Sequence, residues 1–69
     1  MNEIVEIIAA RDGMSWIDAE RNVMDVVHIF ERMLAEHNLN LEEYEDVLRY
    51  ELGLEPDYLP ALLEEAGSI

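Results

Sequence analysis

The segment from Trp16 to Leu34 constrains the fold of this chain more than any other feature. At about 100° of rotation per residue, its apolar residues fall on one broad side of a single helix and its charged residues fall opposite. The apolar residues are Trp16, Ala19, Val23, Met24, Val26, Val27, Phe30, Met33 and Leu34. Their arc spans about half of the helix, which is wider than the stripe of an ordinary surface helix. We therefore expect a long helix over residues 16–37 that other helices, or a second copy of the chain, must cover.

The start of this helix carries a signal of its own. Ser15 precedes Trp16, and the acidic residue Asp18 follows three positions after the serine, as in the Ser-x-x-acid pattern of helix N-termini. Ser15 is therefore expected to cap the helix. Trp16 and Phe30 both lie on the apolar arc, so we expect both rings in the core.

Shorter helices are expected around the long one. Apolar residues recur with helical spacing over residues 3–11, 41–52 and 58–66, and the turns between the helices contain glycine, asparagine or proline. Together these segments predict an all-α fold. We expect a compact bundle of three to four short helices with a long central second helix, in a single helical domain over residues 1–69.

The third helix has the clearest local signature. Asn40 is the expected N-cap, and Glu43 stands three residues later, as in a capping box. Leu39 would pack on Tyr44 as a hydrophobic staple. Leu41 is also expected to face inward, because it follows the same apolar periodicity.

The length of the chain makes a lone core marginal. A domain of 69 residues buries only about 60% of the surface of its unfolded chain. Cysteine is absent, so a disulfide cannot add stability. Self-association or binding of a partner is therefore expected to contribute.

The charge narrows the choice of partner. The net charge is −13, from 17 acidic residues against four arginines, and there is no lysine. Such a chain repels nucleic acid and anionic membranes, and it attracts a basic protein surface. The plainer interpretation is that the charge keeps a small helical protein in solution. No apolar run is long enough to span a membrane, and the N-terminus lacks a signal-peptide pattern, so we expect a cytoplasmic location.

No pattern in the chain predicts catalysis, a metal site or a cofactor. Threonine, cysteine and lysine are absent, and Ser15 is explained by capping. His28 and His37 lack the paired Glu-x-x-His motifs of a carboxylate-bridged metal bundle. The asparagine-rich stretch from Asn38 does not fit a calcium loop, because Glu43 occupies its glycine position.

Two groups of residues are candidates for contact with a partner. On the third helix, Glu42, Glu43 and Asp46 fall together on the outer side with Tyr50, as an acidic patch around an aromatic ring. The alternative is a solvated helix face with a partly covered tyrosine.

The second group lies on the long helix. Glu20 and Glu31 flank the apolar arc, and Ile29 lies off it, close to the polar side. These three residues are candidates for a homodimer contact, although the two glutamates can also extend their charged ends to water along the edge of the core.

Two stretches of the sequence resemble a family of small acidic, uncharacterised proteins of phages and prophages of Gram-positive bacteria. The first is RDGMS at residues 11–15 followed by DAE at 18–20, and the second is ELGLEPDY at 51–58. Members often carry a glycine between the second and third helices. Here the linker is HNLN at residues 37–40 and has no glycine, so a left-handed backbone conformation in it is expected at Asn38. The resemblance implies a phage accessory protein and transfers no active site.

The function expected from these features is non-enzymatic. We expect an acidic phage-type accessory protein that binds a host protein with a basic surface and modulates it by inhibition. Its carboxylates would imitate the charge of nucleic acid. It is not expected to bind nucleic acid or membrane directly. The alternative is a homodimeric structural or assembly protein.

Overall fold

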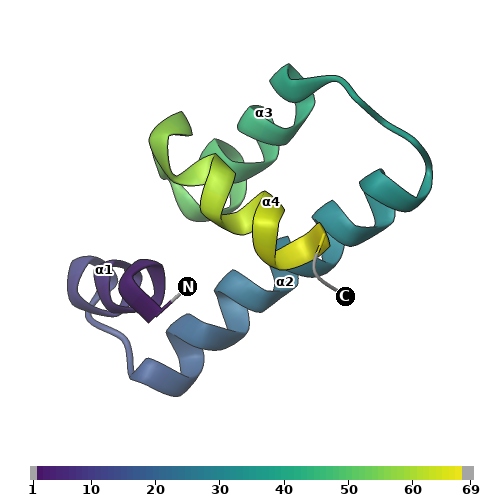
Figure 1. Cartoon of the computed structure of the whole chain (residues 1–69). Helices are drawn as coiled ribbons and strands as arrows, with labels where there is room; N and C mark the ends of the chain where they lie inside the picture. The colour runs from purple at the N-terminus through teal and green to yellow at the C-terminus, as the bar shows by residue number, and fades with distance from the viewer. Residues whose placement is uncertain (1, 68–69) are drawn as a thin grey trace.

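A computed structural model describes residues 2–67 of the chain, and within this range all regular structure is helical (Figure 1). The elements are α1 (Asn2–Asp12), α2 (Trp16–Ala35), α3 (Leu41–Leu52), the 3-10 turn η1 (Pro56–Tyr58) and α4 (Leu59–Gly67). The predicted all-α class, a small bundle with a long second helix, is confirmed.

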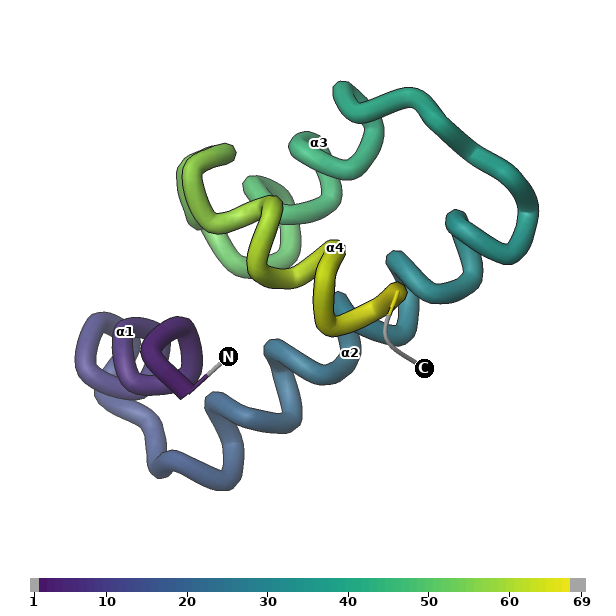
Figure 2. The backbone as a smooth tube through the Cα atoms, in the orientation of Figure 1, coloured from purple at the N-terminus to yellow at the C-terminus, as the bar shows by residue number. Residues whose placement is uncertain are grey.

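The long helix α2 is in contact with each of the other three α-helices. Figure 2 shows α1 beside its N-terminal half and α4 beside its C-terminal half, and α3 contacts both α2 and α4. Ala19, Val23, Val26, Val27 and Phe30 are buried along α2. The wide apolar arc is therefore covered largely by helices of the same chain.

The core gathers residues from every α-helix and from the loop before η1. It consists of Ile4, Val5, Ile8, Ala19, Val23, Val26, Val27, Phe30, Tyr44, Leu48, Leu52, Leu54, Leu59, Leu62 and Ala66. At its centre the rings of Phe30 and Tyr44 meet edge to face, with centroids 5.2 Å apart. Phe30 is thus in the core, as predicted.

The N-terminal end of α2 matches the prediction, and the C-terminal end differs from it. Ser15 caps the start, since its hydroxyl accepts a hydrogen bond from the Asp18 N–H at 3.2 Å, as predicted. The helix ends at Ala35, two residues earlier than predicted, because His37 adopts a left-handed φ of 59°. The N–H groups of His37 and Asn38 then bond the carbonyls of Leu34 and Met33 in a Schellman motif. His37, rather than Asn38, takes the left-handed position.

Three apolar side chains predicted to be buried are exposed: Trp16 by 43%, Leu39 by 85% and Leu41 by 59%. Helical periodicity assigns a side to each residue, but it does not say how far along the axis the neighbouring helices reach. Trp16 and Leu41 both stand in the first turn of their helices. For Leu39, the predicted partner Tyr44 turns into the core instead, so the staple does not form.

The capping box at the start of α3 is also different from the prediction. Asn40 is the N-cap, but its side chain accepts from the Glu42 N–H at 3.1 Å. The N–H of Asn40, which Glu43 would take in a capping box, donates to the side-chain oxygen of Asn38 at 2.9 Å. The Glu43 carboxylate instead accepts from the Asn38 amide. Asn38 therefore joins the linker to the first turn of α3.

Candidate functional site

The outer side of α3 carries the candidate partner-binding residues. Glu42, Glu43, Asp46 and Tyr50 are all exposed, and at about 100° per residue they lie opposite the buried side of the helix. We call these four residues the α3 acidic face. The structure thus brings all four onto one surface.

The charge of this face is only weakly compensated within the chain. Asp46 lies 3.7 Å from Arg49, but both side chains are largely exposed, and such pairs contribute little. The partner of Glu43 is the neutral amide of Asn38. Among the described residues, no ion pair involves Glu42. A basic partner would therefore find three carboxylates whose charge is nearly intact.

Tyr50 contributes an apolar surface to the same face. Its side chain is 88% exposed, so it is not the partly covered tyrosine of the alternative interpretation. Tyrosine is enriched among residues that dominate binding energy when a partner covers them. The face therefore combines charge for attraction with an aromatic ring for burial.

Arg11 fixes the C-terminal end of α3. Its guanidinium donates to the carbonyl oxygens of Leu52 at 2.6 Å and Gly53 at 3.1 Å, and it also pairs with Asp12 at 2.9 Å. A cation at this position satisfies carbonyls that the helix leaves unpaired and interacts favourably with the helix dipole. The hydrogen bond from Arg11 lowers the pKa of the Asp12 carboxyl group. No local pattern in the sequence indicates this role of Arg11, because its partners lie 41 and 42 residues away along the chain.

Tyr44 fixes the other end. Its hydroxyl donates to the backbone carbonyl of Asn38 at 2.6 Å while its ring packs on Phe30. Burial raises the pKa of the Tyr44 hydroxyl, and the negative charge of Glu43 raises it further. The linker and the first turn of α3 are therefore held to the core, so the acidic face is presented on a supported helix.

The candidate dimer residues do not form one surface. Glu20 is exposed and Ile29 is half-buried. Ile29 and Glu31 are two positions apart, so they lie about 160° apart around α2. Glu31 is half-buried and lines a cleft beside α4. The structure therefore does not support a single contact that uses all three.

Within residues 2–67, no group of three or more histidine, aspartate or glutamate side chains is arranged to hold a metal ion. No helix there has the length and apolar character needed to cross a membrane.

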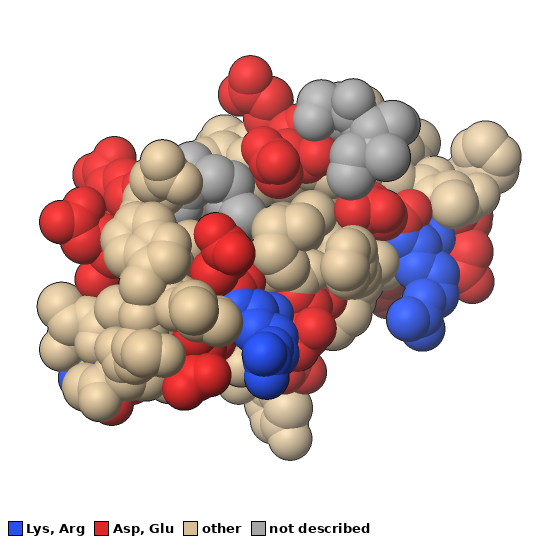
Figure 3. Space-filling model, turned by 90° about the horizontal axis from the view of Figure 1, so that it is seen from below, with Lys and Arg blue, Asp and Glu red and all other residues tan. Residues whose placement is uncertain are grey.

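The acidic residues are not confined to α3. Figure 3 shows Asp and Glu side chains in several groups across one face of the molecule, separated by other residues and by few arginines. Neither a protein-family model, nor a curated protein, nor a solved structure matches the chain. Its function is therefore inferred from the residues themselves.

Proposed function

We propose that the chain is a non-enzymatic, phage-type accessory protein that uses the α3 acidic face to bind a basic surface of a host protein and inhibit it. The observation that carries the proposal is the exposed and weakly compensated charge of this face on a helix held at both ends. The partner would lie in the cytoplasm of a bacterial host.

The density of charge supports a partner that normally binds nucleic acid. The chain has a net charge of −13 over a longest dimension of 35 Å, whereas duplex DNA carries about 20 negative charges over that length. The local density on α3 is closer to that of DNA, because Glu42, Glu43 and Asp46 place three carboxylates within about 6 Å along the helix axis. At the α3 acidic face, a groove lined with lysine and arginine would therefore meet a charge density similar to that of DNA.

The mechanism of such an inhibitor is occupation of the groove. Opposite charges steer the two surfaces together and set the orientation of the complex. Burial of the Tyr50 ring then slows dissociation, because aromatic side chains contribute strongly once water is excluded. The host protein loses access to DNA or RNA while the complex lasts.

The test is capture of host proteins from a Gram-positive bacterial lysate on the immobilised chain, followed by elution with salt. The variant Glu42→Gln/Glu43→Gln/Asp46→Asn removes three charges from the α3 acidic face. The control Glu6→Gln/Asp25→Asn/Glu64→Gln removes three exposed charges elsewhere. We expect one dominant basic nucleic-acid-binding protein with the wild type and the control, released by salt, and its loss with the α3 variant. Equal capture by both variants would exclude this face as the binding site.

The homodimeric assembly protein is the second candidate. Trp16 and Ile17 expose 43% and 67% of their surface at the start of α2, and such neighbouring apolar residues favour a protein contact. Light scattering across micromolar concentrations tests this candidate. A dimeric mass that Trp16→Ser/Ile17→Ser converts to a monomeric mass would favour it over the inhibitor.

A further inference from the structure

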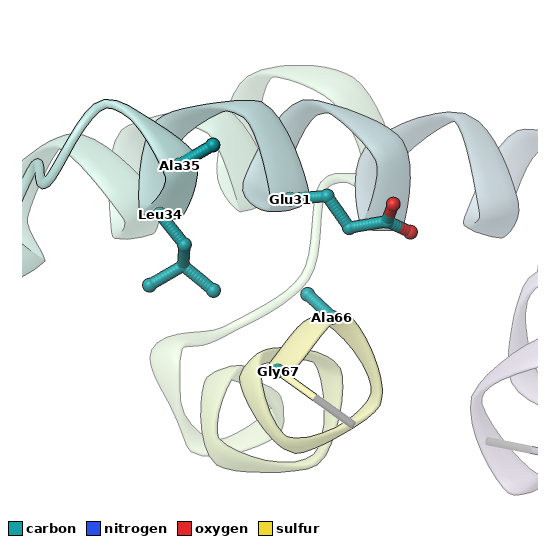
Figure 4. A pocket seen from close by; sticks show the side chains of 5 residues that line it. All are labelled: Glu31, Leu34, Ala35, Ala66 and Gly67. Carbon is teal, nitrogen blue, oxygen red and sulfur yellow. The ribbon is translucent and has the colours of Figure 1, made fainter. Parts of the chain in front are cut away.

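A cleft of about 370 Å³ lies between α2 and α4, away from the α3 acidic face. It is lined by Glu31, Leu34 and Ala35 from α2 and by Ala66 and Gly67 from α4. Figure 4 shows the side chains of Leu34 and Ala66 directed into the space between the two helices, with Glu31 along the same side of α2. Its lining therefore combines aliphatic side chains with polar surface, which includes one carboxylate at the edge.

The Glu31 carboxylate has an unsatisfied oxygen. Its Oε1 atom is buried and has no hydrogen-bond partner among the described residues. An unpaired buried acceptor is costly, and for a carboxylate the cost is greater than for a neutral group. Figure 4 shows the Glu31 side chain extended along α2 away from Leu34, and Oε1 is shielded from solvent in this position. The terminal torsion of a glutamate turns over a broad range at little cost, so a rotation can present the carboxylate to a donor that enters the cleft.

We propose that this cleft receives a lysine side chain of the basic partner, an inference that rests on the proposed function. The aliphatic stem of lysine would lie against Leu34 and Ala66, and its ammonium group would donate to Glu31. Lysine stems pack on apolar surface in this way while the charged end finds a polar partner. Lysine fits better than arginine, because one free carboxylate oxygen suits a compact ammonium group, whereas a guanidinium favours two parallel hydrogen bonds.

The experiment uses small probes on the isotopically labelled full chain, followed by amide NMR. The probes are Nα-acetyl-lysine methylamide and Nα-acetyl-norleucine methylamide, which shares the stem but has no charge. With the lysine probe we expect saturable shifts at the amides of the cleft residues. The norleucine probe should bind about tenfold more weakly, as loss of one charged hydrogen bond implies.

The matched variants are Glu31→Gln and Glu36→Gln, which remove the same charge from the cleft and from the exposed residue directly after α2. We expect Glu31→Gln to weaken the lysine probe about tenfold and Glu36→Gln to leave it nearly unchanged. Equal affinity for the two probes in the wild type would overturn the proposal without any variant, as would shifts confined to α3. Neither of these results would affect the proposed function, which depends on the partner affinity of the α3 variant.

Discussion

Arg11 connects the end of α1 to the end of α3 through the carbonyls of Leu52 and Gly53, and it also pairs with its neighbour Asp12. Because the guanidinium is exposed, we expect Arg11→Ala to reduce the free energy of unfolding by only about 1 kcal/mol. Thermal unfolding should register this as a melting temperature lower by about 4–8 °C. Arg21→Ala, which removes the same charge from an exposed site on α2, is the control and should change stability by less than about 0.5 kcal/mol. An equal effect of both substitutions would show that charge, rather than the contact with α3, is responsible.

His37 occupies a backbone conformation that suits glycine better. Its φ of 59° costs a residue with a side chain about 1–2 kcal/mol. Glycine would remove this backbone strain, but part of the gain in stability is offset because glycine has more conformational entropy in the unfolded chain. We therefore expect His37→Gly to raise the free energy of unfolding by about 0.5–1 kcal/mol in urea titrations.

The adjacent substitution is the matched control for this prediction. Asn38→Gly removes the side chain that bonds Asn40 and Glu43, so it should destabilise the protein. A stabilising Asn38→Gly together with a destabilising His37→Gly would place the left-handed residue at Asn38 after all.

Tyr44 should make the stability depend on alkaline pH. Its pKa is raised in the folded chain, chiefly by burial and also by the charge of Glu43. As pH rises, the unfolded chain therefore loses the Tyr44 proton before the folded chain does. The contribution of Tyr44 to the free energy of unfolding is complete below about pH 10, the ordinary pKa of tyrosine. This contribution is lost as pH rises through the folded-state pKa. Urea titrations between pH 8 and 11 should show a free energy of unfolding that declines above about pH 10. In Tyr44→Phe this decline should be smaller, and an unchanged slope would assign it to other groups.

At the scale of helices, the short α4 closes the core over α2. Leu62 is completely buried and belongs to the central cluster. We expect Leu62→Ala to cost about 2–5 kcal/mol, as loss of a buried leucine does, which is a large part of the stability of a small domain. Leu39→Ala, at an exposed leucine, should stay within about 0.5 kcal/mol. The free energy of unfolding of both variants would be measured by chemical denaturation. An equally small decrease for Leu62→Ala and Leu39→Ala would mean that α4 is not tightly packed.

The helices and their N-cap residues were largely predictable, because periodicity and N-cap chemistry are local properties of the chain. Ser15 and the inward sides of α2 and α3 are examples. What local patterns could not supply was contact between distant segments. Trp16 is exposed although it lies on the apolar side, and Arg11 has partners in α3 that no spacing suggests. The candidate sites differ in the same way. The α3 acidic face was predictable from one helix, whereas the cleft at Glu31 requires the position of α4.

At the scale of the whole molecule, the dominant property is excess negative charge on a small body. All four arginines together leave a net charge of −13, and one of them, Arg11, has a structural role. At physiological ionic strength, exposed charges more than about 8 Å apart are largely screened. Groups such as the α3 acidic face should therefore act locally, and the total charge should mainly affect the rate of encounter.

The affinity for the captured host protein tests the central claim most directly. Dissociation constants would be measured at 50 and 200 mM NaCl for the wild type, the α3 variant and the control with three charges removed elsewhere. We predict that the α3 variant binds at least about tenfold more weakly at low salt, with a shallower salt dependence, and that the control differs from the wild type by less than about threefold. Equal losses in the two variants would contradict recognition by the α3 acidic face and would leave only a nonspecific attraction of opposite charges.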